Sequence, residues 1–334
     1  MRRRILDWLV CPRCAKDLHV EDAREEADRI LAGRLVCEQG HAFAIRAGVP
    51  RMTLDAQLDS GDRQAPRPDE TRAGQAIAAS FGREWTHFDY DKGRTWHADL
   101  DERCDLFLRE VDCPANSLAN KVVFDAGCGN GSLSWGICRH GCEVLAADVS
   151  DSVERAYAYY AQRGDEHTHF VQADLMHPPV RPGAFDLVYS SGVLHHNPDT
   201  HEALLSIARA IKPGGRIYIW VYHKEPGLKF ALQLRLRSMI APLPAPAKHA
   251  FVKAWSTQAI LRQSVRRFLG RDGAENRVTW KEKVVDLMDI YTPRYRWMHT
   301  RDQVHDWYDQ MGLQDIKVTE VRDWGFGTLG TRPG

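Results

Sequence analysis

An apolar segment that runs directly into a glycine-rich turn constrains the fold of this chain more than any other feature. Residues 121–124 (Lys-Val-Val-Phe) have the composition of a buried strand, and the turn Asp125-Ala126-Gly127-Cys128-Gly129-Asn130-Gly131-Ser132 follows them. Glycine at every second position lets the backbone approach a ligand closely, and residues 133–138 can begin a helix. The G-x-G-x-G spacing differs from the G-x-G-x-x-G of dinucleotide-binding folds. We therefore expect a strand, a ligand-binding turn and a helix in this order.

Further apolar segments recur at intervals that suit strands alternating with helices. They span 143–147, 169–173, 185–190 and 216–222. This alternation predicts an α/β fold with a doubly wound parallel sheet, whose ligands lie beyond the carboxyl ends of the strands. Four polar residues fall at such ends: Asp125, Asp148, Asp174 and Ser190. A carboxylate placed like that of Asp148 can accept hydrogen bonds from both hydroxyls of a ribose.

The order of these motifs resembles the class I S-adenosylmethionine (SAM)-dependent methyltransferases of the small-molecule type. The resemblance rests on D-A-G-C-G-N-G (125–131), F-D-L-V (185–188), L-H-H (194–196) and K-P-G-G-R-I (212–217). It implies a Rossmann-like seven-stranded sheet, SAM held with its amino-acid end at the turn, and adenine beside Asp174. The cofactor-binding residues it implies are Asp125, Gly127, Cys128, Gly129, Gly131, Asp148, Val149, Asp174, Leu175 and Ser190.

Near the start of the chain, two cysteine-containing pairs have the spacing of a metal site. Cys11 and Cys14 form C-x2-C, and Cys37 and His41 form C-x3-H. Three thiolates and one imidazole favour tetrahedral zinc, and four protein ligands leave no open position, so the predicted Zn²⁺ is structural. A ribbon this short would depend on the metal for its folding energy.

The residues around the second pair resemble two kinds of zinc ribbon. Residues 41–52 are similar to the end of the Trm112-like module that precedes many bacterial methyltransferases. The C-x3-H pair also resembles the ribbon of rRNA guanine methyltransferases, where it contacts RNA. An RNA substrate therefore stays open, although the acidic segment 21–28 is a poor surface for phosphates.

Length and composition set broad limits on the organisation and location of the chain. The 334 residues, 43% of them apolar, suffice for a buried core and more than one module. The formal net charge of +0 gives no overall attraction to nucleic acid, and no apolar run has the length of a membrane span. Eight cysteines in so long a chain do not resemble a disulfide framework, so we expect a cytoplasmic protein.

We expect five segments along the chain, with a basic helical cap as the most unusual. They are a zinc ribbon (1–55), a linker (56–75), a SAM-binding core (76–225), the cap (226–289) and the rest of the core (290–334). Residues 226–271 contain nine Lys or Arg and no Asp or Glu, and three prolines between 242 and 246 split them into two helices. Such helices suit an anionic or lipid-linked acceptor, an acidic membrane surface, or RNA phosphates; a packing cap with a solvated basic face is equally compatible.

Methyl transfer from a sulfonium requires alignment, exclusion of water and, for a protonated acceptor, a base. We predict His196, His195 and Tyr291 as the catalytic residues, with His196 the preferred base; Tyr222 and His223 are further possibilities. The resulting hypothesis is O-methylation of a small-molecule or lipid-linked metabolite by in-line displacement. The alternatives are an RNA methyltransferase that docks through the ribbon and a SAM-binding protein without transferase activity.

Overall fold

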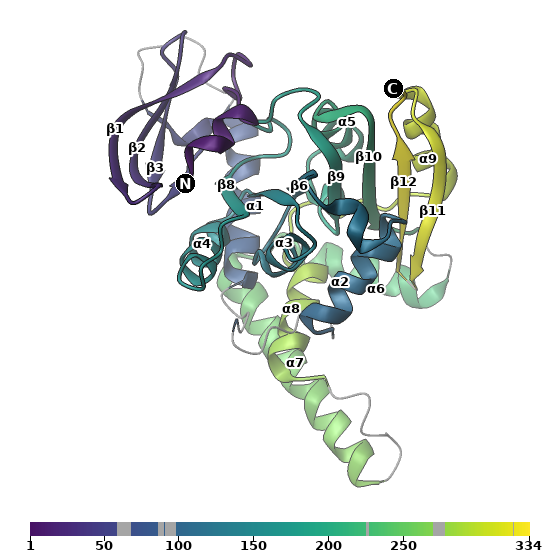
Figure 1. Ribbon diagram of the computed structural model, residues 1–334. Helices are drawn as coiled ribbons and strands as arrows, with labels where there is room; N and C mark the ends of the chain where they lie inside the picture. The colour runs from purple at the N-terminus through teal and green to yellow at the C-terminus, as the bar shows by residue number, and fades with distance from the viewer. Residues whose placement is uncertain (59–67, 86–89, 91–97, 225–226, 270–277, 323) are drawn as a thin grey trace.

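The central element of the computed structural model is a seven-stranded sheet. The structure describes residues 1–58, 68–85, 90, 98–224, 227–269, 278–322 and 324–334. The strands lie in the order β11-β12-β10-β9-β6-β7-β8, and β12 is antiparallel to both of its neighbours. The strands are β6 (Val122–Ala126), β7 (Glu143–Asp148), β8 (Thr168–Gln172), β9 (Phe185–Ser191), β10 (Ile211–Tyr222), β11 (Gln314–Arg322) and β12 (Gly325–Thr331). Strands β10, β9, β6, β7 and β8 are parallel, which confirms the predicted doubly wound α/β sheet (Figure 1).

Helices connect and flank these strands, and several begin at capping residues. They are α2 (Leu100–Glu110), α3 (Ser132–Cys138), α4 (Ser152–Ala161), α5 (Thr200–Ala208) and α9 (Arg301–Gln310), with short 3-10 turns η3 (Ala115–Leu118) and η4 (Leu194–His196). Asp99 forms a capping box with Glu102 at the start of α2. At the start of α9, the N-cap Thr300 accepts a hydrogen bond from the backbone of Gln303. These caps satisfy backbone donors that have no partner within the helix.

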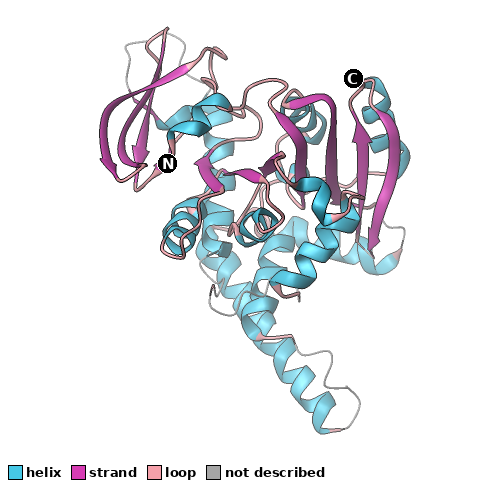
Figure 2. Cartoon of the chain, in the orientation of Figure 1, coloured by secondary structure: helices cyan, strands magenta, loops and turns pink. Residues whose placement is uncertain are grey.

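The N-terminal module is a small antiparallel sheet that packs on the β8 side of the large one (Figure 2). It comprises η1 (Arg3–Asp7), β1 (Leu18–Glu26), β2 (Arg29–Cys37), β3 (Ala42–Arg46), β4 (Val49–Pro50), η2 (Leu54–Ala56) and β5 (Gln57–Leu58). Its apolar side chains join one continuous core with those of the large sheet, and the backbone amide of Met52 donates to the carbonyl of Gln172 at 2.8 Å. The N-terminal module therefore shares its hydrophobic core with the large sheet.

Four helices lie at the carboxyl ends of the parallel strands. They are α1 (Pro68–Trp85), α6 (Leu228–Ile240), α7 (Ala245–Phe268) and α8 (Trp280–Tyr291). The cap splits into α6 and α7 at the prolines, as predicted, and α7 projects away from the body (Figure 1). Helix α1 begins inside the segment expected to be a linker, whose residues 59–67 lie outside the described part. Among the described helices, none combines the length and apolarity that crossing a bilayer requires.

Candidate active site and metal centre

The glycine-rich turn between β6 and α3 adopts conformations that other residues avoid. Gly127, Gly129 and Gly131 have φ angles of 100°, 57° and 72°. A Cβ atom at Gly127 would lie 2.4 Å from the Val193 side chain, and one at Gly129 would lie 2.5 Å from the Trp85 ring. Both the backbone conformation and the close neighbours therefore require glycine at these two positions.

Asp148 ends β7 beside this turn and is held by it. One carboxylate oxygen accepts a hydrogen bond from the Gly129 amide at 2.9 Å, and the other accepts from the amide and hydroxyl of Ser150 at 2.9 and 2.7 Å. Burial raises the pKa of Asp148, and the hydrogen bonds oppose this effect. The two carboxylate oxygens have about four acceptor sites and three are used, so the oxygen that accepts from Gly129 can still receive one ligand hydroxyl.

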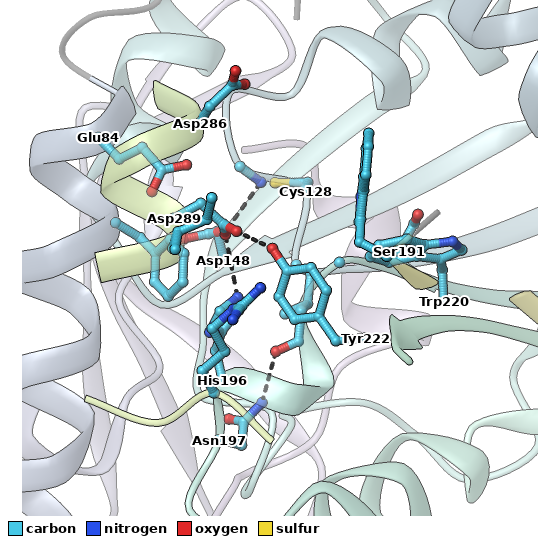
Figure 3. Close-up of a pocket in the computed structure, with 18 of the residues that line it drawn as sticks. Glu84, Cys128, Asp148, Ser191, His196, Asn197, Trp220, Tyr222, Asp286 and Asp289 are labelled. Atoms are coloured by element: carbon cyan, nitrogen blue, oxygen red, sulfur yellow. Dashed lines mark hydrogen bonds and ion pairs between the residues drawn. The ribbon is translucent and has the colours of Figure 1, made fainter. Parts of the chain in front are cut away.

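A cavity of about 810 Å³ opens in front of the turn and extends to the cap (Figure 3). Its volume falls within the roughly 300–1,000 Å³ typical of small-molecule sites. Most of the residues predicted to bind the cofactor line it: Gly127, Cys128, Gly129, Asp148, Val149, Asp174 and Leu175. His196 lines the same cavity, together with Tyr222 and His223. The turn and the preferred catalytic histidine thus share one cavity.

Three of the residues predicted to bind the cofactor do not line the cavity. Asp125 is buried and accepts a 2.6 Å hydrogen bond from the Ser134 hydroxyl, and burial raises its pKa to about 6. The Ser190 hydroxyl donates to the carbonyl of Ala126 at 2.7 Å, and Gly131 is the N-cap of α3. These residues fix the shape of the turn without lining the cavity.

Two of the predicted catalytic residues also lie outside the cavity lining. His195 is fully buried, with its ring centroid 4.2 Å from that of Tyr222. Burial lowers the pKa of His195, and the charges of neighbouring groups lower it further, so its ring is neutral near pH 7. Tyr291 packs between Phe251 and Trp255 in the apolar core of the cap.

His196 forms part of a hydrogen-bonded group that sequence reasoning did not find. Its Nδ1 lies 2.9 Å from the Tyr295 carbonyl oxygen, and its Nε2 lies 3.2 Å from Oδ1 of Asp289. The Tyr222 hydroxyl donates to Oδ2 of the same aspartate (Figure 3). Both ring nitrogens of His196 thus lie near an acceptor, one a backbone carbonyl and the other a carboxylate.

Burial and hydrogen bonding act in opposite directions on this group. Burial alone would raise the pKa of Asp289, but hydrogen bonds from His196 and Tyr222 hold it below its usual value. Burial raises the pKa of Tyr222, and the negative charge of Asp289 adds to the effect. Asp289 is therefore ionised near pH 7 and Tyr222 is a neutral hydrogen-bond donor.

The acidic residues of α1 and α8 are the main part of the cavity that sequence reasoning missed. Glu84, Asp286 and Asp289 all line it. Asp286 and Asp289 are three residues apart, a spacing that places them on one helix face, so a periodicity search of 280–291 could have found them. Glu84 lies near the end of α1, where no sequence motif marked it.

The predicted metal ligands converge in the N-terminal module. The ligand atoms of Cys11, Cys14, Cys37 and His41 all lie within 4.8 Å of one another. Nδ1 of His41 lies 3.4 Å from the Cys11 sulfur and 3.5 Å from the Cys37 sulfur, and the Cys14 and Cys37 sulfurs are 3.7 Å apart. Zn–S bonds of about 2.3 Å and Zn–N bonds of about 2.0 Å in a tetrahedron require separations close to these.

Comparison with known proteins supports the interpretation of the central sheet. Residues 124–219 match the model of a family described as "Methyltransferase domain". This segment is similar to methyltransferase domains. It runs from β6 into β10 and includes the glycine-rich turn, Asp148, Asp174 and His196.

Curated relatives match the region around the methyltransferase domain. The chain is 34% identical over 142 residues to malonyl-[acyl-carrier protein] O-methyltransferase of Enterobacter lignolyticus, covering 42% of this chain and 51% of that protein. It is 32% identical over 114 residues to ubiquinone biosynthesis O-methyltransferase of Vibrio cholerae, covering 34% and 46%. The chain thus spans about half the length of the curated relatives it matches.

Among solved structures, the chain is similar to magnesium protoporphyrin IX methyltransferase of Synechocystis with bound SAH. The match covers 79% of this chain and 100% of that chain, with 16% identity and a TM-score of 0.45.

Proposed function

We propose that the protein transfers a methyl group from SAM to an oxygen of a small-molecule or lipid-linked acceptor. The observation that carries this proposal is the single cavity that joins the glycine-rich turn and Asp148 to the group formed by His196, Asp289 and Tyr222. Two named relatives, a malonyl-[acyl-carrier protein] and a ubiquinone biosynthesis O-methyltransferase, support oxygen as the acceptor atom. The proposal keeps the expected division into ribbon (1–55), core (76–225 and 290–334) and basic cap (226–289).

The residues around the turn suit SAM as the methyl donor. The backbone at Gly127 and Gly129 is bare of side chains, Asp148 has acceptor capacity for the ribose, and Val149, Asp174 and Leu175 continue the same wall. SAM supplies an electrophilic methyl group on a sulfonium. Enclosure by α1 and α8 would exclude water and align the acceptor, and such alignment can lower a barrier by roughly 7–11 kcal/mol.

The transfer itself forms one bond and breaks one. A lone pair of the acceptor oxygen attacks the methyl carbon, and the carbon–sulfur pair of electrons goes to sulfur, which becomes neutral. An ionised acceptor needs no base. For a hydroxyl acceptor, we propose that the proton passes to the His196–Asp289 pair, whose carboxylate is ionised and faces the cavity.

A labelling experiment tests this function. The purified protein is incubated with methyl-labelled SAM and a cell extract separated into RNA, lipid, protein and small-molecule pools. We expect label in the small-molecule or organic-extractable pool. Label confined to a nuclease-sensitive pool would establish the RNA alternative, and SAM binding without label in any pool would favour a protein that binds SAM without transferring it.

We also propose that Cys11, Cys14, Cys37 and His41 hold a structural zinc ion, with the ribbon a Trm112-like module. The converging donor atoms support this, because three sulfurs and one imidazole nitrogen at these separations suit tetrahedral Zn²⁺. The four ligands would close the coordination sphere, so the ion would stabilise the ribbon and take no part in catalysis.

The far end of α7 supports contact with an anionic lipid surface, which we propose as the cap's partner. Leu261, Val265 and Phe268 share one helix face and are 62, 57 and 91% exposed. Arg262 and Arg266 lie next to this apolar stripe, and α7 contains no acidic residue. A helix end that combines an apolar stripe with positive charges can enter a lipid headgroup layer, whereas those charges oppose pairing with a second copy.

A further inference from the structure

One buried carboxyl group in the cavity has no role in the site described so far. Glu84, near the end of α1, is 1% exposed, and neither of its carboxyl oxygens has a hydrogen-bond partner in the described part of the chain. The group nevertheless lines the cavity, and Figure 3 shows it pointing toward the acidic residues there. Burying a polar group without a partner costs free energy, so a ligand group is the natural partner for it.

The surroundings of Glu84 select for positive charge. Its carboxyl group interacts unfavourably with those of Asp289, Asp148 and Asp286. Each of these three already has a partner: Asp289 contacts His196, Asp148 accepts from Gly129, and Asp286 lies 3.4 Å from Lys283. Glu84 alone adds an unmatched acid to this wall, and only a cation would be favoured by all four groups together.

Glu84 lies on the part of α1 that covers the proposed binding site of the methyl donor. The next residue, Trp85, packs over Gly129 in the glycine-rich turn, and a Cβ atom at Gly82 would lie 2.9 Å from the Asp151 carboxylate after β7. This end of α1 therefore covers the proposed SAM site. On the other side, α8 presents Asp289, which belongs to the proposed reaction group. Glu84 thus interacts both with the carboxylate beside the glycine-rich turn, Asp148, and with that of the proposed reaction group, Asp289.

We propose that the Glu84 carboxylate is the counter-ion of the SAM sulfonium in this cavity. The inference rests on the proposed function, since it takes SAM as the ligand of the turn. It identifies a binding and positioning residue on the helix that precedes the methyltransferase domain. After transfer the sulfur is neutral, so the same carboxylate would favour the substrate over the product and would assist release of S-adenosylhomocysteine (SAH).

The protonation of Glu84 adds a measurable signature. Burial raises the pKa of Glu84 well above its usual value, and the negative charges nearby raise it further, so both effects favour the neutral acid in the free protein. Forming the ion pair would release this proton to solvent. The other charged groups on the elements around it are Asp148, Asp151, Arg155, His196, Lys283, Asp286, Asp289 and Arg296.

Calorimetric titration of wild type and Glu84→Gln with SAM and with SAH tests the proposal. We expect Glu84→Gln to weaken SAM binding by about 30-fold or more, since one partner of a buried ion pair is lost, and SAH binding by less than about 3-fold. Wild type should release close to one proton on binding SAM, measured in two buffers of different ionisation enthalpy, and the variant none. Glutamine matches the neutral acid in shape, so the free variant should keep its melting temperature.

The binding results distinguish a failure of the sulfonium proposal from a failure of the proposed function. Equal weakening of SAM and SAH binding would assign Glu84 to the ammonium group that both ligands carry, and would overturn the sulfonium proposal. Unchanged affinity for both would overturn any role in cofactor binding. Absence of SAM binding by the wild type would instead refute the proposed function. Glu202→Gln, on the exposed side of α5, is the matched control and should leave both affinities unchanged.

Discussion

His196, in the turn η4 after β9, and Asp289, on the cap helix α8, meet at 3.2 Å between Nε2 and Oδ1. This contact joins the methyltransferase domain to the cap, because the two residues belong to different segments of the chain. It also engages the nitrogen of His196 that would otherwise face the acceptor, so the imidazole acts together with the carboxylate.

We predict that Asp289→Asn lowers kcat by about 100-fold, a typical effect of losing proton transfer, and changes KM for SAM much less. The amide cannot stabilise a protonated His196 or receive a proton from the acceptor. Measuring kcat and KM between pH 5.5 and 9 checks this, with His201→Gln as a control histidine outside the cavity. An unchanged kcat and pH profile would show that the pair only supports the loop.

Replacing Gly129 should affect cofactor binding more than stability. Alanine there must adopt a positive φ and displace the Trp85 ring, so we expect a loss of about 1–2 kcal/mol in unfolding free energy and at least tenfold weaker SAM binding. Gly164→Ala has a similar backbone conformation, with φ of 75° and no atom near the added Cβ. If both variants bind SAM equally well, the contact between Trp85 and the turn is not part of the site.

Zinc removal should destabilise the ribbon and, through the shared core, the whole protein. We expect close to one zinc ion per chain by elemental analysis and its loss in Cys14→Ser, with a clearly lower melting temperature. Cys113→Ser replaces a buried cysteine outside the cluster and should retain the metal. A metal-free wild type with the same melting temperature would refute a structural ion.

Asp125 should make the stability of the protein depend on pH. Its folded pKa of about 6 lies above the usual 3.8, so the folded state retains its proton longer than the unfolded state does. The contribution of Asp125 to the free energy of unfolding is complete below about pH 4 and is lost as pH rises to about 6. The total loss is roughly 3 kcal/mol. Chemical denaturation of wild type and Asp125→Asn at pH 4 to 7 gives the free energy of unfolding of each protein. The difference between the two free energies should change by this amount over the range. A difference that stays constant with pH would contradict the prediction.

Contact between α7 and lipid can be measured with vesicles. We expect binding to vesicles that contain anionic phospholipid, weak binding to purely zwitterionic ones, and loss of binding in Phe268→Ser, which removes the most exposed apolar side chain of the stripe. Leu228→Ser, at the start of α6, removes a comparably exposed side chain away from this tip. Equal binding to both kinds of vesicle, or to neither, would refute the proposal.

Local sequence patterns predicted most of the sheet and the glycine-rich turn. The strand before Gly127 and the two cap helices separated by prolines depend on neighbouring residues alone. The contact of His196 with Asp289 could not be predicted in this way, because it depends on how α8 packs over η4. Asp125 and Ser190 illustrate a second limit: a position at the end of a strand does not specify whether the side chain faces the ligand or the core.

The N-terminal ribbon reaches the cavity through two side-chain hydrogen bonds. Arg51 donates to the side chain of Gln172 at 3.0 Å, and Gln172 donates to the carbonyl of Val149, which lines the cavity, at 2.9 Å. Metal occupancy and donor affinity would then be thermodynamically linked, each favouring the other. Protein purified under strongly chelating conditions would score as a poor SAM binder even though every residue touching SAM is intact.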